Sequence, residues 1–284
     1  MKLVTTIQEL EKLLALYRSL KNNIGLVPTM GALHEGHASL VRKSVDENRV
    51  TVVSIFVNPT QFNDKNDLLK YPRTLEADIA LLETCGADIV FAPTINEVYP
   101  EEDTRTFSYP PLDQVMEGKF RPGHFNGVCQ IVSKLFLITR PARAYFGEKD
   151  FQQLAIIREM VRQYPFDIEI IGCPIVREND GLALSSRNMR LSPTQRRQAL
   201  TISKTLFAAQ KQTGEYTLPK LKKWVEHEIE KAEGLELEYF EIVDGNTLQT
   251  VSDWKDADYI VGCITVFCGE VRLIDNITLK NNAV

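Results

Sequence analysis

Two of the four histidines in this 284-residue chain lie three positions apart, in the segment Pro28-Thr29-Met30-Gly31-Ala32-Leu33-His34-Glu35-Gly36-His37. The segment follows an apolar run and precedes a helical pattern, which predicts a strand, a tight turn and a first helical turn. Side chains three apart on a helix share one face. Free main-chain N–H groups and the helix dipole at such a junction favour a bound phosphate. The alternative is that the glycines only form the turn and the histidines only cap the helix.

This first segment is not a standard nucleotide motif. Gly31 and Gly36 have the spacing of a phosphate loop, but His37 stands where that loop needs lysine. The chain also lacks Gly-x-Gly-x-x-Gly, which disfavours a dinucleotide.

A second candidate segment, Gly147-Glu148-Lys149-Asp150, again follows a strand-like run and precedes a helical pattern. Lys149 can meet a phosphate as a point charge. Asp150 can accept hydrogen bonds from sugar hydroxyls, although capping of the following helix explains it equally well.

Two further polar segments are candidates, one at the predicted domain junction and one at the end of a predicted strand. The run from Arg177 to Asn188 contains Ser185-Ser186-Arg187, whose hydroxyl and guanidinium groups can close over phosphate oxygens. A mere linker is the competing interpretation. Gln61 follows the β-branched run 50–57 and can hold a carboxylate or a hydroxyl, whereas a turn is the simpler role for Asn58-Pro59.

The elements that must position these residues alternate between strands and helices. Predicted strands cover 24–28, 50–57, 88–92, 144–147 and 168–171, and predicted helices cover 6–17, 36–47, 74–85, 128–139 and a segment that ends near 162. A polar loop is expected over 58–71. Such alternation predicts a parallel α/β sheet, in which ligands bind beyond the carboxyl ends of the strands.

The pattern changes after Cys173-Pro174. Ser192-Pro193-Thr194-Gln195 is a strong helix start, with helices expected to 212 and over 218–232. Strand-like runs follow at 237–243, 259–267 and 271–277. We therefore expect two domains, 1–175 and 176–284, the second a smaller α+β unit.

Composition excludes several classes of protein. Lys+Arg 33 against Asp+Glu 38 gives a net charge of −5, without the basic field that nucleic acid or anionic membrane requires. The longest uncharged stretch, 50–63, is too polar to span a membrane, and no secretory signal opens the chain. Five scattered cysteines without Cys-x-x-Cys suit reduced, buried thiols in a cytoplasmic protein.

Taken together, these segments resemble the family of AMP-forming pantoate–β-alanine ligases over nearly the whole chain. The resemblance extends to 71–78, 121–125 and 272–276. His34-Glu35-Gly36-His37 is similar to the His-x-Gly-His signature of nucleotidyltransferases related to class I aminoacyl-tRNA synthetases. The sequence departs from the family pattern at Asn63, where glycine is expected, and at Arg190, where an aromatic residue is expected.

The resemblance implies a Rossmann-like parallel-sheet nucleotidyltransferase domain followed by the smaller α+β domain. It implies a homodimer with ATP, pantoate and β-alanine as small-molecule substrates. The expected ATP-binding residues are Met30, Gly31, Ala32, Leu33, His34, Glu35, Gly36, His37, Gly147, Glu148, Lys149, Asp150, Val176, Leu184, Ser185, Ser186 and Arg187. The expected substrate-binding residues are Gln61 and Gln153.

The expected chemistry is attack of the pantoate carboxylate on the α-phosphorus of MgATP, followed by attack of β-alanine on pantoyl adenylate. Two like unit charges ~4 Å apart repel by about 4 kcal/mol at an effective dielectric of 20, so cationic groups must be in place. We assign this role to His37, His34, Lys149, Arg187 and Mg²⁺, with Asp78 as the candidate metal ligand. The Ser185–Arg187 loop and the smaller domain would close to exclude water.

Two other functions use the same residues. A related nucleotidyltransferase would transfer a nucleotide to a phosphorylated metabolite. A non-catalytic nucleotide sensor would bind ATP without turnover, which leaves the paired histidines, Gln61 and Gln153 without a task. An aminoacyl-tRNA synthetase is disfavoured, because the chain is acidic and lacks residues for an anticodon-binding domain.

Overall fold

The computed structural model describes residues 1–21 and 23–282, which form two compact units. The first unit consists of Met1–Tyr109, Arg121–Glu148 and Ile156–Pro174. The second consists of Pro110–Phe120, Lys149–Ala155 and the chain from Ile175 onward. Two short excursions, 110–120 and 149–155, therefore belong to the second unit although they interrupt the sequence of the first.

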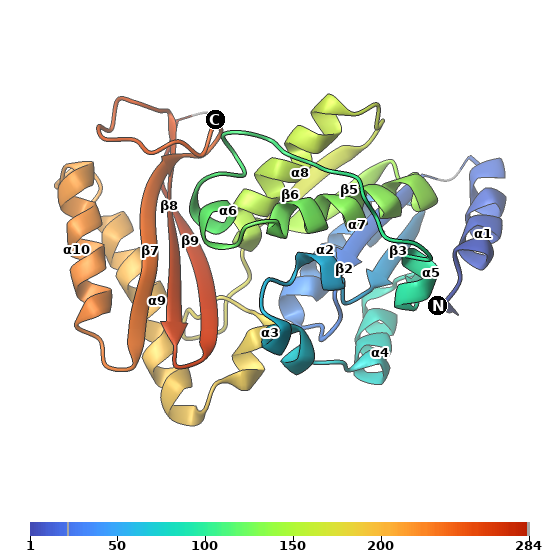
Figure 1. Cartoon of the computed structure of the whole chain (residues 1–284), viewed down its shortest axis with the longest axis horizontal. Coiled ribbons are helices and arrows are strands. Elements are labelled where there is room, and N and C mark those ends of the chain that lie inside the picture. Colours follow the sequence, from blue (N-terminus) through green and yellow to red (C-terminus); the bar gives the residue numbers. More distant parts are fainter. Residues whose placement is uncertain (22, 283–284) are drawn as a thin grey trace. The chain divides into compact units, whose positions relative to one another are not determined.

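The first unit is built on a six-stranded sheet in the order β1-β4-β3-β2-β5-β6, with every pair parallel. Figure 1 labels four of these strands, β2, β3, β5 and β6. The strands are β1 (Lys2–Val4), β2 (Ile24–Thr29), β3 (Val50–Ile55), β4 (Ile89–Phe91), β5 (Arg143–Gly147) and β6 (Glu169–Cys173). The order runs in one direction from β2 to β4 and in the other from β2 to β6. The reversal lies between β2 and β5, where open α/β sheets bind their ligands.

Helices cover this sheet. The first unit contains α1 (Ile7–Ser19), α2 (Glu35–Glu47), η1 (Pro59–Gln61), α3 (Lys65–Lys70), α4 (Leu75–Cys85), α5 (Ile95–Val98) and α7 (His124–Thr139). Helices α2 and α4 pack with Val27, Val53 and Val90 in one apolar cluster. Neighbouring strand residues such as Leu26 and Val52, which point to the opposite face, are also fully buried. Burial on both faces is why these strands read as continuous apolar runs.

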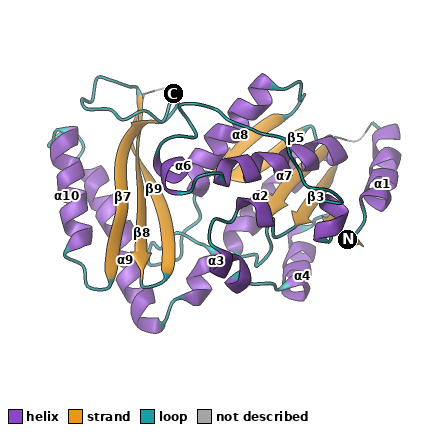
Figure 2. Ribbon diagram, viewed as in Figure 1, coloured by secondary structure: helices purple, strands orange, loops and turns teal. Residues whose placement is uncertain are grey.

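The second unit has a three-stranded antiparallel sheet, β7 (Leu235–Asp244), β8 (Tyr259–Cys268) and β9 (Val271–Asn281). Figure 2 shows α9 (Pro193–Lys211) and α10 (Leu218–Glu230) beside these strands, and their apolar residues share one core with the sheet. The remaining elements are α6 (Met116–Phe120), η2 (Glu148–Asp150), α8 (Phe151–Gln163) and η3 (Ser186–Arg190). Helix α8 begins in the second unit and ends in the first.

The fold class expected from the sequence is confirmed: a parallel α/β sheet followed by a small α+β sheet. The capping box at Ser192 is also confirmed, since its hydroxyl accepts from the N–H of Gln195 and its own N–H donates to Gln195 Oε1. All five cysteines are buried and free. Within the described chain, no helix has the length and apolar character needed to cross a bilayer.

Two local predictions were wrong, and one strand was not predicted. The segment 58–71 is not a plain loop, because Asp64 accepts from the N–H of Asn66 at 2.8 Å and starts α3. Helix α7 begins at His124, four residues before the predicted start, since Gly123 provides the N-cap in a left-handed conformation. The short strand β1 was missed; its three residues pair with β4, a long-range contact that a local pattern cannot show.

Candidate active site

The first candidate segment joins β2 to α2 and is held by its own histidines. His34 is the N-cap, and its Nδ1 accepts from the N–H of Gly36 at 3.1 Å. The N–H of His34 in turn donates to Nδ1 of His37 at 3.3 Å, and the two ring centroids lie 4.1 Å apart. Because both Nδ1 atoms accept from main-chain N–H groups, each neutral ring carries its proton on Nε2. The pair therefore offers two Nε2–H donors at a helix N-terminus.

The turn before these histidines is fixed by Asp78 from α4. Asp78 is 2% exposed, and its carboxylate accepts from the N–H groups of Ala32 at 3.0 Å and Leu33 at 2.8 Å. Gly31 has φ +79°, and a Cβ there would lie 3.0 Å from Asp78 Oδ2. Hydrogen bonds from main-chain N–H groups to a carboxylate are among the stronger ones, so Asp78 holds 31–33 in one conformation.

The same hydrogen bonds reduce the capacity of the Asp78 carboxylate to bind a metal ion. Oδ1 also accepts from Thr74 Oγ1 at 3.1 Å and so has two donors, whereas Oδ2 has one. Among the described residues, no three His, Cys, Asp or Glu side chains form a group that could hold a metal ion. A cation at Asp78 would need most of its ligands from phosphate or water, as Mg²⁺ at nucleotides usually does.

The second candidate segment begins at the end of β5, next to β2. Gly25 pairs with Arg143 and Leu26 with Ala144 in parallel register. The carboxyl ends of β2 and β5 therefore lie at the same edge of the sheet, on either side of the point where the strand order reverses. The structure thus places the segment that starts at Met30 and the one that starts at Gly147 at the expected ligand edge of the first unit.

Gln61, the candidate substrate residue, is buried and held on three sides. Asn58 Nδ2 donates to its Oε1 at 3.1 Å, and its own Nε2 lies 3.3 Å from Met30 Sδ. His124 Nδ1 donates to the main-chain oxygen of Gln61 at 2.8 Å. Arg121 Nη1 lies 3.1 Å from Nε2 of the same imidazole. Since Nδ1 of His124 is the donor, its Nε2 can accept from the guanidinium when the ring is neutral.

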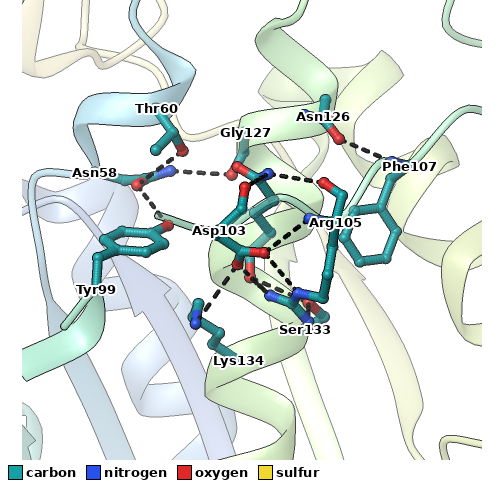
Figure 3. Close-up of polar contacts among 11 residues, drawn as sticks. Asn58, Thr60, Tyr99, Asp103, Arg105, Phe107, Asn126, Gly127, Ser133 and Lys134 are labelled. Atoms are coloured by element: carbon teal, nitrogen blue, oxygen red, sulfur yellow. Dashed lines mark hydrogen bonds and ion pairs between the residues drawn. The ribbon is translucent and has the colours of Figure 1, made fainter. Parts of the chain in front are cut away.

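Asn58 is itself tightly positioned, as Figure 3 shows. Its Oδ1 accepts from Tyr99 Oη at 2.9 Å and Thr60 Oγ1 at 3.2 Å, and its Nδ2 also donates to the main-chain oxygen of Gly127 at 3.0 Å. Burial raises the pKa of Tyr99, which keeps the phenol protonated and able to donate. A Cβ on Gly127 would lie 2.4 Å from the oxygen of Thr60, so only glycine lets α7 approach this loop.

Figure 3 also shows a second cluster of polar side chains. This cluster binds the segment that follows α5 to helix α7. Asp103 accepts from Arg105 Nε at 2.8 Å and Nη2 at 2.6 Å, and Lys134 Nζ lies 3.5 Å away. Hydrogen bonding from Arg105 lowers the pKa of Asp103 to about 2. Arg105 also donates to Ser133 Oγ and to the oxygen of Gln130, both at 3.0 Å. These charges hold the chain against the helix that carries Gly127.

The remaining candidates lie in the second unit. Val176 and Leu184 face each other in a hairpin, with the N–H of Leu184 bound to the oxygen of Val176 at 3.0 Å. Ser185 caps η3 by accepting from the N–H of Arg187 at 3.3 Å. Lys149 and Asp150 lie in η2, and Gln153 lies on α8. The segment 177–188 is therefore an ordered hairpin and 3-10 turn rather than an extended linker.

Sequence reasoning missed the residues that hold Gln61. The local sequence favours a turn role for Asn58, and His124 and Arg121 stand out only as part of the family-like stretch 121–125. The spacing Asn-Pro-Thr-Gln is a usable signal, because an amide three residues before another can bind it across a 3-10 turn. Tyr99 and Gly127 carry no such local signal, since they lie 41 and 69 residues from Asn58.

The chain is similar to proteins of a single family over almost its whole length. The family model "Pantoate-beta-alanine ligase" matches residues 2–278. A pantothenate synthetase of Bacteroides thetaiotaomicron is 68% identical over 280 residues, covering 99% of both chains. One from Phocaeicola vulgatus is 69% identical over 281 residues, covering 99% of this chain and all of the relative.

Solved structures agree with the sequence relatives. The pantothenate synthetase of Thermus thermophilus superimposes with a TM-score of 0.93 at 42% identity and covers 99% of this chain and 100% of its own. A pantoate–β-alanine ligase from Francisella tularensis, solved with "Beta-gamma ATP and Beta-alanine", gives a TM-score of 0.81 at 36% identity and 98% coverage of each chain. The chain therefore belongs to the pantoate–β-alanine ligase family.

Proposed function

We propose that this chain is an AMP-forming ligase that condenses pantoate with β-alanine. ATP would first adenylate the pantoate carboxylate and release pyrophosphate, and the β-alanine amine would then displace AMP. The observation that carries this proposal is the arrangement around β2 and β5. Two segments with anion-binding features leave adjacent parallel strands at the point where the strand order reverses, and one of them presents two imidazole Nε2–H donors.

The ATP would be bound by Met30–His37, Gly147–Asp150, Val176 and Leu184–Arg187. The family relationship and the ATP-containing Francisella tularensis relative support this assignment. Gln61 and Gln153 would bind pantoate and β-alanine. For Gln61, the fixed orientation of its amide by Asn58 and Met30 supports a role in recognition, because a preoriented amide loses little entropy on binding.

His37 would act as a hydrogen-bond donor from Nε2 to phosphate oxygens. A doubly protonated ring would lose the contact in which Nδ1 accepts from the N–H of His34, so the neutral tautomer matches the cap. His34 would donate in the same way. Lys149 and Arg187 would then supply the full positive charges that offset repulsion between carboxylate and triphosphate.

Magnesium would enter as part of the MgATP substrate. The charge that it adds to the phosphates favours attack by an anion. We propose Asp78 Oδ2 as the protein atom that would contact this ion, because among the described residues it accepts a hydrogen bond from the N–H of Ala32 alone. The position of Asp78 beside the 31–33 turn supports the assignment.

Three further properties belong to the same proposal. The residues from 176 to 284 would act as a lid domain that excludes water from the adenylate, since acyl adenylates hydrolyse readily. The enzyme would work in the cytoplasm, in keeping with its five reduced cysteines. It would form a homodimer, as the resemblance to the family suggests.

The direct test is mass spectrometry of the purified chain with ATP, Mg²⁺, pantoate and β-alanine. Pantothenate and AMP are the expected products, and pyrophosphate should appear with pantoate alone. A nucleotidyltransferase would instead need a phosphorylated acceptor, and a sensor would bind ATP without turnover. Gln61→Ala should impair use of pantoate more than ATP binding, whereas Gln163→Ala, on the exposed end of α8, should change neither. Weaker ATP binding in Gln61→Ala would contradict the assigned pocket.

A further inference from the structure

Strand β9 carries two adjacent buried polar residues in an otherwise apolar stretch. Asp275 is 5% exposed and Asn276 is 7% exposed. Leu273 and Ile277, two residues from Asp275 on the same face, belong to the apolar core formed with α9 and α10. A carboxylate and an amide at such places require bound partners, and both partners are segments that carry proposed ATP-binding residues.

Asp275 holds the hairpin that contains Val176 and Leu184. Arg177 donates to its carboxylate through Nη1 at 2.7 Å and Nη2 at 2.9 Å, and the Asp275 side chain is only 4% exposed. The guanidinium also lies 5.0 Å from the ring centroid of Phe207 on α9. A buried bidentate pair fixes orientation as well as distance, so the base of the hairpin is fixed to β9.

The position of Arg177 determines where the following residues lie. Arg177 pairs with Ala183 across the hairpin, and Asn188 Nδ2 donates to the oxygen of Ala183 at 3.0 Å. Leu184 is bound to Val176 at the same base. The turn that presents Ser185–Arg187 is therefore connected, through main-chain hydrogen bonds and the Asn188 side chain, to the Arg177–Asp275 ion pair on β9.

Asn276 holds the second segment. Its Nδ2 donates to the main-chain oxygen of Lys149 at 3.1 Å. The contact uses the main chain of Lys149 and not its ammonium group. Phe151, two residues further, packs edge-on against Tyr259 of β8 with centroids 6.1 Å apart. Asn276 thus fixes the start of α8 while the Lys149 side chain stays available for a ligand.

We propose that Asp275 and Asn276 are positioning residues for adenylation, which together set the Lys149 segment and the 176–187 hairpin for one triphosphate. Neighbouring strand residues point to opposite faces, so one short stretch of β9 sets two segments that are far apart in sequence. This inference rests on the proposed function, because it assigns the two anchors to the ATP-binding residues named there.

The test is a double-mutant cycle in pantoate-dependent ATP–pyrophosphate exchange. Asn276→Ala should lower kcat/KM for ATP about tenfold, which corresponds to 1.4 kcal/mol and is typical of one buried hydrogen bond. In a Lys149→Ala background the same change should cost less than about twofold, because no ammonium remains to be positioned. A purely structural residue would lower kcat/KM equally in both backgrounds, and that result would overturn the proposal.

The Asp275 anchor has a parallel test. Arg177→Met should lower exchange about tenfold, and Arg177→Lys should restore part of it, because lysine keeps the charge but loses the bidentate geometry. The loss should shrink in an Arg187→Ala background. Lys280→Met is the matched control, since Lys280 is also a polar anchor on β9 but binds the oxygens of Trp254 and Ala257; its exchange rate should be unchanged.

Two outcomes separate this inference from the function on which it rests. If Lys149→Ala and Arg187→Ala both leave exchange unchanged, the proposed ATP assignment fails. If they impair exchange but Asn276→Ala and Arg177→Met do not, the anchors fail and the function stands. Should Asn276→Ala not fold, Asn276→Leu removes the donor without leaving a cavity, and its melting temperature and exchange rate give the same decision.

Discussion

The main-chain N–H of His34 donates to Nδ1 of His37, while Nδ1 of His34 accepts from the main-chain N–H of Gly36, the second residue of α2. Both imidazoles thus complete the N-terminus of the helix with one nitrogen and keep the other as a donor. The catalytic and the capping interpretations of these histidines are therefore compatible. Their spacing of three residues serves both, because a capping box needs the same spacing.

Replacing His37 tests the donor role. His37→Ala should lower the adenylation rate by about 10²–10³-fold, the range for removal of one transition-state donor. Pantoate-dependent ATP–pyrophosphate exchange measures this step alone. His227→Ala, on α10, is the control and should leave exchange unchanged. Exchange within twofold of the parent rate in His37→Ala would exclude the proposed role.

Asp78→Asn tests the support of the 31–33 turn. The amide keeps one acceptor oxygen but loses the charge that binds the N–H groups of Ala32 and Leu33. We expect a loss of about 1.5–3 kcal/mol in the free energy of unfolding in urea, as for hydrogen bonds to charged groups. The apparent KM for ATP should rise as well.

The same variant tests the magnesium assignment. If Asp78 also contacts the metal of MgATP, the Mg²⁺ concentration that gives half-maximal exchange should rise in Asp78→Asn. An unchanged magnesium dependence together with reduced stability would leave Asp78 with the turn alone. Asp46→Asn, at an exposed carboxylate of α2, should affect neither measurement.

Gly127→Ala should disturb the loop that holds Gln61. The added Cβ would lie 2.4 Å from Thr60 O and 2.7 Å from the N of Gln61, so the loop or the helix must move. Overpacking of this kind costs about 1–3 kcal/mol, and the KM for pantoate should rise more than that for ATP. Gly214→Ala, where no atom lies within 4 Å of the added Cβ but φ is +88°, should lower stability through backbone strain alone and leave the KM for pantoate unchanged. Equal kinetic effects from the two variants would contradict the prediction.

The Asp103–Arg105 pair predicts a pH dependence of stability. The pKa of Asp103 is lowered from 3.8 to about 2 in the folded chain by hydrogen bonding from Arg105. A depressed carboxyl pKa stabilises the folded state above the unfolded pKa and stops doing so as pH falls through the folded value. The contribution of about 2 kcal/mol should thus be complete at pH 7 and vanish between pH 4 and 2.

Chemical unfolding of Asp103→Asn across this range measures the effect. The variant should be less stable than the parent at pH 7, and the difference should shrink toward pH 2. A difference that stays constant from pH 7 to pH 2 would show that the ion pair is not its source. Lys134→Met, which removes the more distant cation at 3.5 Å, should have a smaller effect.

The alternation of strands and helices, and the junctions proposed to bind phosphate, could be predicted from the amino-acid sequence alone. Continuous apolar runs such as 50–55 are buried on both faces, and strong caps such as Ser192 start their helices where expected. These features depend on residues within a few positions of one another. For that reason a single chain reveals them, and the pairing of His34 with His37 belongs to the same class.

The contacts that hold the candidate site in place depend on the packing of distant segments and could not be predicted. Asp78 reaches Ala32 across 46 residues, Tyr99 reaches Asn58 across 41, and Asn276 reaches Lys149 across 127. Each partner looks like an ordinary polar residue in its local sequence. A buried polar group must find a partner in whichever segment folding places beside it, and that choice is made by the packing of distant elements rather than by any local pattern.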